Sequence, residues 1–331
     1  MRNLRSLPFF FAMAGCSRRC IYCDQKQITG ESATPSPREI RHFLQRIEEP
    51  VEIAFFGGSF TCLPPEQIDS YMEAAGTAPR GSSLRFSTHP LCISREILAR
   101  LKNSPGAPCP LACVELGISS LDDAVLKACS RGYTGDEALQ ALDILVQEDL
   151  PPGAQLMIGL PGQDEASSLE DLRRLAKVKG PRSMDLRIYP CLVLAGTPLE
   201  ELWTSGRFTP LETGQAARWA GRLLLEALDL GFNVLRVGLA ETPSLAASVK
   251  AGPHHPAFGE LAWGDCLARL LTRNSINGPW VEHRDKRSFF TGHGKWGLKR
   301  LGALSQGDES EPKGSLRFWP PEASTQRNSR E

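Results

Sequence analysis

The first two thirds of this chain alternate short apolar runs with segments of helical periodicity. Seven runs are predicted to be strands, at residues 9–14, 51–56, 84–87, 113–117, 155–160, 186–191 and 233–237. Between the first two runs, four apolar residues recur at the intervals of one helix face: Ile40, Phe43, Leu44 and Ile47. Strands that alternate with helices build a parallel sheet. The pattern therefore predicts an α/β fold, without separating a barrel from an open doubly wound sheet.

The pattern changes after about residue 240. Pro and Gly cluster in residues 251–259, and from about residue 305 the chain is polar with little periodicity. We expect an α/β domain over residues 1–240, a small C-terminal α+β subdomain over 241–318 and a flexible tail over 319–331. A chain of 331 residues is long enough for this arrangement.

Composition excludes several classes of protein. The 38 Lys and Arg balance 38 Asp and Glu, and 41% of the residues are hydrophobic, which argues against a disordered chain or a polybasic nucleic-acid coat. The longest apolar run, residues 7–14, is too short to cross a bilayer, which takes roughly 18 residues. We expect neither membrane insertion nor secretion. Most of the ten cysteines are scattered, which predicts a reducing, cytoplasmic location rather than a disulfide scaffold.

Three cysteines stand together directly after the first predicted strand. Cys16, Cys20 and Cys23 are separated by gaps of three and two residues. Three thiolates on one short loop predict a metal site. A structural zinc takes four ligands, and no His or fourth Cys follows within the next dozen residues, so zinc would need a distant Cys. A 4Fe–4S cluster on three cysteines leaves one iron open, and S-adenosylmethionine (SAM) is the small molecule known to use it, which is the interpretation we favour.

Two segments together resemble the radical SAM superfamily. The cysteine loop carries an aromatic residue, Tyr22, before its last cysteine. After the second predicted strand, Gly57, Gly58, Ser59 and Phe60 resemble the segment that meets the SAM amino group in this family. Backbone without side chains allows the close approach of a ligand, although a Gly pair alone is more often only a turn. The resemblance implies a partial (β/α)6 barrel whose C-terminal strand ends face a 4Fe–4S cluster and SAM.

Later segments resemble one branch of that family, which contains the elongator catalytic subunit and the coproporphyrinogen-oxidase-like proteins. They follow in the order seen there: residues 114–127, 131–134, 157–162 and 186–190. This resemblance implies that Glu115 and Arg131 lie near the SAM ribose or methionine carboxylate, and Gly159 beside the adenine. The alternatives are a solvated charge at a strand end for Glu115 and a helix-surface charge for Arg131.

The chain departs from both relatives in ways that narrow the expected activity. Elongator catalytic subunits have a longer gap between their first two cluster cysteines and a C-terminal acetyltransferase domain, so we do not expect acetyl-CoA loading by that route. Coproporphyrinogen dehydrogenases place another Cys two positions after the triplet, where this chain has Gln25, which disfavours haem synthesis. His89 and Ser119 also replace residues that relatives often have, so the SAM or substrate environment is expected to differ.

Other cysteines and histidines each have two explanations. Cys109 and Cys113 form half of an auxiliary cluster or a redox pair, or are packed thiols, which we favour. Cys62 is expected near the cluster mouth, with a buried small hydrophobic residue as the favoured interpretation. His254 and His255, bracketed by prolines, form either a rigid loop over the barrel mouth or a solvated turn.

Residues 271–300 are basic and aromatic. Seven Lys or Arg stand against Glu282 and Asp285, a local balance of +5 (7 − 2): Arg273, Arg284, Lys286, Arg287, Lys295, Lys299 and Arg300. Four aromatic residues alternate with them: Trp280, Phe289, Phe290 and Trp296. Basic side chains bind phosphates and aromatic rings stack on unpaired bases, which favours RNA. A solvated face beside a small hydrophobic patch explains the same composition and is slightly favoured.

These observations predict a cytoplasmic radical SAM enzyme. It would cleave SAM reductively at a 4Fe–4S cluster, generate a 5′-deoxyadenosyl radical and act on a tRNA base, with a flavodoxin- or ferredoxin-type protein as electron donor. One alternative is a radical SAM enzyme with a small-molecule or peptide substrate. An alternative of another class is a non-catalytic module that binds zinc or RNA.

Overall fold

The computed structural model describes residues 4–104 and 109–319. They form two compact units. The larger unit comprises the described parts of residues 1–216 together with 226–256, and the smaller unit comprises 217–225 and the described parts of 257–331. The predicted flexible tail lies outside the described residues except for Trp319. The predicted domain boundaries stay a prediction.

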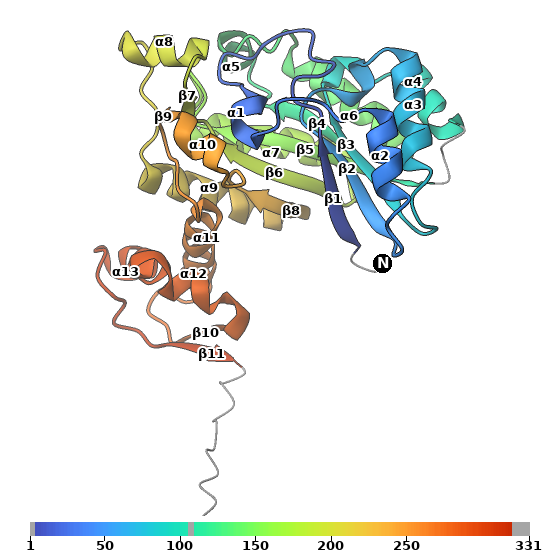
Figure 1. The fold of residues 1–331 in the computed structure, drawn as a ribbon. Helices are drawn as coiled ribbons and strands as arrows, with labels where there is room; N and C mark the ends of the chain where they lie inside the picture. Colours follow the sequence, from blue (N-terminus) through green and yellow to red (C-terminus); the bar gives the residue numbers. More distant parts are fainter. Residues whose placement is uncertain (1–3, 105–108, 320–331) are drawn as a thin grey trace, which may run out of the picture. The chain divides into compact units, whose positions relative to one another are not determined.

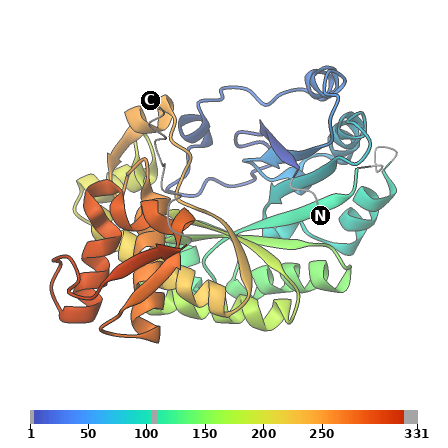
Figure 2. The same cartoon turned by 90° about the horizontal axis from the view of Figure 1, so that it is seen from below.

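One seven-stranded parallel sheet forms the centre of the larger unit, in the order β1-β2-β3-β4-β5-β6-β8. Its strands are β1 (Arg5–Phe10), β2 (Val51–Phe56), β3 (Ser83–Thr88), β4 (Leu111–Ser119), β5 (Pro152–Ile158), β6 (Met184–Pro190) and β8 (Phe232–Val237). A doubly wound sheet reverses its strand order at a switch point, and this order never reverses. The sheet curls into a half-barrel, which confirms the predicted fold class (Figures 1 and 2).

All seven predicted strands are present, and the first is displaced. It was expected over residues 9–14, whereas β1 ends at Phe10, where it pairs with Phe56 at the end of β2. The apolar residues that follow are not in the sheet. Phe11 and Ala12 are buried at the start of the loop that carries the cysteine triplet. Their hydrophobicity therefore serves the packing of this loop rather than a strand.

Helices connect the strands. They are α1 (Gln25–Thr29), α2 (Pro37–Leu44), α3 (Pro65–Ala75), α4 (Arg95–Asn103), α5 (Asp123–Ala128), α6 (Gly135–Gln147), α7 (Glu165–Lys179), α8 (Pro198–Thr204), α9 (Thr213–Asp229) and α10 (Pro243–Ser248). The predicted helix face around Ile40 is α2, which ends at Leu44, so that Ile47 lies in the following turn. In α6, Thr134 and Glu137 form a capping box, which satisfies backbone N–H groups of the first turn. None of the helices within the described ranges is long and apolar enough to span a membrane.

Aromatic rings pack between the first three strands and α3. Phe11, Phe55, Phe60, Tyr71 and Phe86 are buried, with neighbouring ring centroids 4.7 to 6.3 Å apart. Large rings bury much apolar surface, and tilted or edge-on pairs of this kind add to the packing. This core supports the loops after β1, β2 and β3, which carry much of the candidate site.

The smaller unit is α+β, as expected. It contains α11 (Phe258–Asn274), α12 (Arg287–Thr291), α13 (Trp296–Gln306) and the parallel pair β10 (Trp280–His283) and β11 (Leu316–Trp319). In the larger unit, β7 (Val193–Leu194) and β9 (Val249–Ala251) form a further antiparallel pair. The buried Asp265 of the smaller unit accepts hydrogen bonds from Arg300 at 2.7 Å and Arg269 at 2.5 Å. A buried carboxylate needs such partners.

Candidate functional site

A cavity of about 830 Å³ lies on one face of the half-barrel sheet. Alternate residues of the strands line it, since successive side chains of a strand point to opposite faces. All three cysteines of the triplet line it too. Five of the predicted SAM-site residues also line it: Tyr22, Gly57, Gly58, Ser59 and Arg131. The other three, Phe60, Glu115 and Gly159, do not belong to its lining.

The loop between β1 and α1, which we call the cluster loop (residues 11–24), carries the cysteines. Cys16, Cys20 and Cys23 are half-buried free thiols. Burial raises the pKa of Cys16, and burial together with the neighbouring cysteines raises the pKa of Cys23 to about 12. Both thiols are therefore protonated at neutral pH when no metal is bound. Binding of a metal would deprotonate them and release protons.

The donor set fits a cluster better than one zinc ion. A zinc ion needs its ligands within about 2.0–2.3 Å of a single point. A structural zinc takes four ligands, whereas the triplet supplies three cysteines. In an iron–sulfur cube each cysteine binds a different iron, so three half-buried thiols around a cavity suit it. The three cysteines are thus the residues that would hold a 4Fe–4S cluster.

The segment of residues 57–60, which we call the Gly-Gly segment, packs closely against the cluster loop. Gly57 and Gly58 have φ values of 73° and 55°, a conformation that favours glycine. A Cβ on Gly58 would overlap the carbonyl oxygens of Ala14 and Phe11. The Ser59 N–H donates to the Ala14 carbonyl at 2.8 Å. The close approach of the two backbones therefore requires glycine at position 58.

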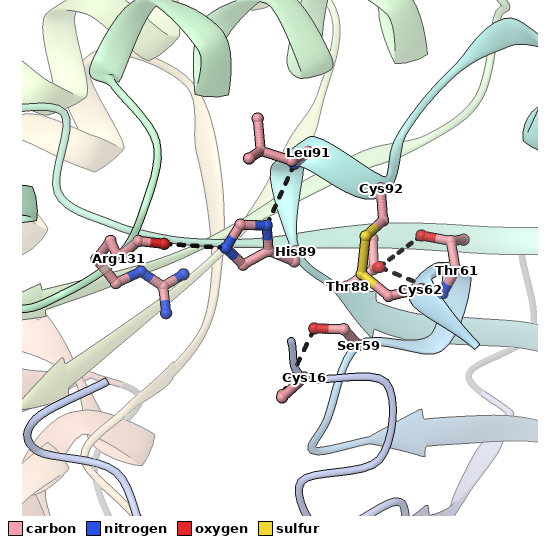
Figure 3. Close-up of a disulfide and its surroundings, with 9 residues drawn as sticks. All are labelled: Cys16, Ser59, Thr61, Cys62, Thr88, His89, Leu91, Cys92 and Arg131. Atoms are coloured by element: carbon pink, nitrogen blue, oxygen red, sulfur yellow. Dashed lines mark hydrogen bonds between the residues drawn. A yellow bond between two sulfur atoms is a disulfide. The ribbon is translucent and has the colours of Figure 1, made fainter. Parts of the chain in front are cut away.

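Ser59 lines the cavity, whereas Phe60 lies in the core. The Ser59 hydroxyl lies 3.7 Å from the Cys16 sulfur (Figure 3). Phe60 is 1% exposed within the aromatic core, so its side chain supports this segment from behind. A direct role for either residue in SAM binding stays a prediction.

Arg131 is buried beside the cluster cysteines rather than on a helix surface. Its Nη1 donates to the Cys20 sulfur at 2.8 Å, and its Nε donates to the Tyr133 hydroxyl at 3.1 Å. A further N–H donates to the Gly117 carbonyl. Tyr22 packs nearby, with its hydroxyl 2.8 Å from the Ser119 hydroxyl. A cation at this position stabilises the negative charge of a thiolate or of a bound carboxylate.

Glu115 lies in a buried network of charged side chains on the inner strands. Its carboxylate accepts from Arg85 at 2.7 Å, from Arg187 at 2.8 and 3.1 Å, and from Gln155 at 2.9 Å. Glu52 and Asp185 complete what we call the ion network. Burial raises the pKa of Glu115, but the hydrogen bonds from Arg187, Gln155 and Arg85 outweigh it and hold the pKa below its ordinary value.

The ion network bears on two predicted roles. The Glu115 carboxylate is fully occupied, so SAM would have to compete with two arginines for it. Gly159 follows β5 with φ 76°, and a Cβ there would lie 2.8 Å from Leu211. The roles of both residues toward SAM stay predictions. Sequence reasoning missed Arg85 and Arg187, which line the cavity.

Cys62 forms a disulfide with Cys92, so its interpretation as a buried free thiol is wrong. The short helices η1 (Phe60–Cys62) and η2 (Pro90–Cys92) follow the adjacent strands β2 and β3, which brings the two cysteines together. Figure 3 shows Ser59, on one linked loop, beside Cys16, and His89, on the other, beside Arg131. The His89 ring nitrogen lies 3.3 Å from the Arg131 carbonyl oxygen. The disulfide thus joins two loops that border the cysteines of the cluster loop.

The remaining candidates lie away from the cavity. Cys109 and Cys113 are buried free thiols, as the packed-thiol interpretation expects, and burial raises the pKa of Cys109 to about 11. The His254 ring lies 3.0 Å from the Glu241 carboxylate. Neither His254 nor His255 belongs to the lining of the cavity.

The aromatic residues of segment 271–300 mostly build the core of the smaller unit. Trp280 and Phe290 are buried, and the Trp296 ring N–H donates to the Leu261 carbonyl at 2.9 Å. Arg300 pairs with Asp265, whereas five other basic residues are exposed: Arg273, Arg284, Arg287, Lys295 and Lys299. Core packing therefore accounts for the rings. Of the five exposed basic side chains, Lys295 pairs with Glu311 and Arg284 lies 3.9 Å from the Asp285 carboxylate.

Comparisons with known proteins agree with this geometry. The Radical SAM superfamily matches residues 11–176, half of the chain, and the Radical SAM C-terminal domain matches residues 185–265. A Methanocaldococcus jannaschii protein named tRNA uridine(34) acetyltransferase is 31% identical over 197 residues, covering 52% of this chain and 35% of that protein. The first three curated relatives are covered over only 19%, 35% and 51% of their lengths.

Solved structures show the same fold. The archaeal Methanocaldococcus infernus Elp3 superposes with a TM-score of 0.58 at 18% identity, covering 82% of this chain and 63% of that one. Streptococcus suis SuiB bound to S-adenosylmethionine superposes with a TM-score of 0.50 at 13% identity, covering 70% and 50%. At these identities the likeness concerns the fold.

Proposed function

This chain belongs to the radical SAM superfamily, whose enzymes use a 4Fe–4S cluster and SAM, and we propose that it acts on a base of tRNA. The observation that carries the substrate is the similarity to a tRNA uridine(34) acetyltransferase over 52% of the chain. We do not extend the proposal to acetyl transfer, because only 35% of that relative is matched.

Different residues around the cavity would bind the cluster and SAM. Cys16, Cys20 and Cys23 would hold the cluster, and the Gly-Gly segment and Arg131 would receive the amino and carboxylate groups of SAM. When bound, the cluster and SAM would supply the radical chemistry that removes a hydrogen atom from the substrate. The surrounding chain orients that hydrogen and excludes water.

Positive charge on the smaller unit supports an RNA partner. Five Lys and Arg side chains in segment 271–300 are exposed, and in this proposal they would exchange contacts within the chain, such as Lys295 with Glu311, for contacts with phosphates. Base stacking on the aromatic residues of this segment is not part of the proposal, because those rings pack in the core. The electron would come from a flavodoxin- or ferredoxin-type protein, and we propose a cytoplasmic location, where tRNA is available.

A small molecule or peptide is the second candidate substrate. A cavity of about 830 Å³ would hold the cluster and SAM, and a small substrate is compatible with a concave site of this kind. The zinc module has less support, because the chain belongs to the radical SAM superfamily.

The test uses protein reconstituted anaerobically with iron and sulfide. We expect formation of 5′-deoxyadenosine and methionine under dithionite, and faster formation when total tRNA is added. Binding of tRNA should weaken steeply between 50 and 200 mM salt, because phosphate neutralisation releases counterions. If SAM is cleaved but tRNA neither binds nor accelerates cleavage, the tRNA proposal is wrong and a small molecule or peptide is favoured.

A further inference from the structure

We infer that Gln25 is a positioning residue, which holds the Gly-Gly segment against the cluster loop and so fixes the backbone that receives SAM. The inference deepens the proposed function and rests on it for the role of SAM. Gln25 stands two residues after Cys23, is the first residue of α1 and lines the cavity. No member of the cysteine triplet makes the contacts that Gln25 makes.

The Gln25 side-chain oxygen joins the two loops directly. It accepts hydrogen bonds from the backbone N–H of Met13 at 2.6 Å and from the backbone N–H of Gly58 at 2.7 Å. An amide oxygen has two lone pairs and accepts both at once. Met13 belongs to the cluster loop and Gly58 to the segment after β2, so one atom bridges backbone 45 positions apart (58 − 13).

Both backbone positions need such a partner. Met13 has φ 63°, a left-handed conformation that costs a residue with a side chain free energy. Gly58 leaves no space for a Cβ between the carbonyls of Ala14 and Phe11. A half-buried N–H group without an acceptor loses a hydrogen bond that water no longer fully replaces. Gln25 therefore stabilises a turn and a close approach that are unfavourable alone.

The helix that carries Gln25 is itself anchored. Asp24 caps α1 by accepting from the Gln27 N–H at 3.1 Å. The Gln27 side chain donates to Asp24 at 3.0 Å and to the Ala195 carbonyl at 2.8 Å. These contacts fix the first turn of α1 and place the Gln25 side chain between the two loops.

The contact also has a chemical consequence for SAM. Because the Gly58 N–H donates to Gln25, it is not available to a ligand. A ligand would therefore have to contact this segment through groups other than the Gly58 N–H, and Gln25 fixes the position of the segment.

The first test needs no cofactor. In Gln25→Leu, hydrogen exchange of the Met13 and Gly58 amides in the metal-free protein should accelerate at least about tenfold, the effect of one lost hydrogen bond. In Gln25→Glu, which keeps an acceptor at the same position, both amides should stay protected. Lys26→Met, on the exposed neighbouring residue of α1, should leave both amides at the wild-type rate.

The second test measures SAM binding by equilibrium dialysis to reconstituted protein. Gln25→Leu should bind the full amount of iron but weaken the SAM dissociation constant about tenfold. Unchanged amide exchange together with a SAM dissociation constant within twofold of wild type would refute the positioning role. If wild-type protein binds no SAM, the proposed function fails instead, while the amide measurement still decides whether Gln25 holds the two loops.

Discussion

Two polar regions contact the same cavity and differ in how completely their groups are paired. In the ion network, Glu115 is 1% exposed and accepts four hydrogen bonds from Arg85, Arg187 and Gln155. In the cluster loop, the three cysteines are half-buried free thiols. Buried polar groups that are satisfied by the chain stabilise the fold. The Cys20 sulfur accepts from Arg131 and the Cys16 sulfur contacts the Ser59 hydroxyl, and both sulfurs can still bind iron.

This comparison indicates which polar residues can contact a ligand. Glu115 has a charge that suggests a ligand contact, but it lies in the middle of β4 rather than at the predicted strand end, and its hydrogen-bonding capacity is taken up by neighbours. Gln25 carries no charge and still links the two loops that border the cavity. Charge alone therefore does not identify the residues that shape the cavity.

The largest effect is expected at the cluster loop. Cys20→Ala should abolish cluster binding, because the two remaining cysteines cannot hold a cube that already has only three protein ligands. Iron content and visible absorbance after anaerobic reconstitution measure it. Cys129→Ala is the matched control, since Cys129 is buried in the apolar cluster against which Cys20 packs. Wild-type iron content in Cys20→Ala would contradict the three-cysteine site.

In the ion network, we expect a substitution to lower the stability of the fold and to leave the cluster cysteines in place. Glu115→Ala leaves Arg85 and Arg187 without their shared buried carboxylate, which should lower the free energy of unfolding by about 3–5 kcal/mol. The exposed pair Arg41–Glu73 is the comparison, and Glu73→Ala should cost under about 1 kcal/mol. Urea unfolding measures both. Equal effects of the two substitutions would remove the distinction that we draw for the ion network.

The disulfide tests how the loops beside the cluster loop are held. It spans 30 residues of sequence, and its loss in the double variant Cys62→Ser, Cys92→Ser should lower the free energy of unfolding by about 3 kcal/mol. The hydroxyls of Thr61 and Thr88, 2.6 Å apart, would then be a remaining link between the same loops. Mass spectrometry of unreduced peptides checks the bond itself. If the wild-type peptides carry free thiols, this assignment is wrong.

The spacing of the cysteines predicted a metal site, and periodicity predicted an α/β fold, whereas the half-barrel was implied only by the resemblance to the radical SAM superfamily. The sequence could not predict the ion network, whose members stand on separate strands and meet only through register, such as the pairing of Gln155 with Arg187. The disulfide had a usable signal. Cys62 and Cys92 each follow a strand by a few residues, and loops after adjacent parallel strands lie close together.

Gln25 shows a second limit of prediction from the sequence. The sequence shows only that position 25 lacks the cysteine found in coproporphyrinogen dehydrogenases. A side chain that accepts hydrogen bonds from two distant backbone groups leaves no pattern in the sequence. Phe60 was expected at the SAM site from the segment that it belongs to, whereas its side chain packs in the aromatic core. Local motifs locate a segment, and three-dimensional packing decides which of its atoms face the ligand.

The smallest effect compares two buried carboxyls with different numbers of partners. Asp171, 3% exposed, accepts a side-chain hydrogen bond from Ser120 at 2.7 Å, and burial raises its pKa to about 6, whereas the several donors around Glu115 lower the pKa of that carboxyl. The folded state therefore holds a proton on Asp171 that the unfolded state, with a pKa near 3.9, releases. The stabilisation by this neutral carboxyl is complete below about pH 4 and is lost as the pH rises through 6.

Asp171→Asn isolates that dependence, because the amide stays neutral at every pH and keeps an oxygen that accepts from Ser120. Relative to wild type, the variant should gain on the order of 2 kcal/mol in the free energy of unfolding between pH 4 and pH 7. Urea unfolding at several pH values across this range measures the difference. A difference between variant and wild type that does not change with pH would mean that Asp171 ionises as readily in the folded chain as in the unfolded one. The number of donors would then not decide the charge of a buried carboxyl in this protein, and the contrast with Glu115 would have to be explained by the two arginines alone.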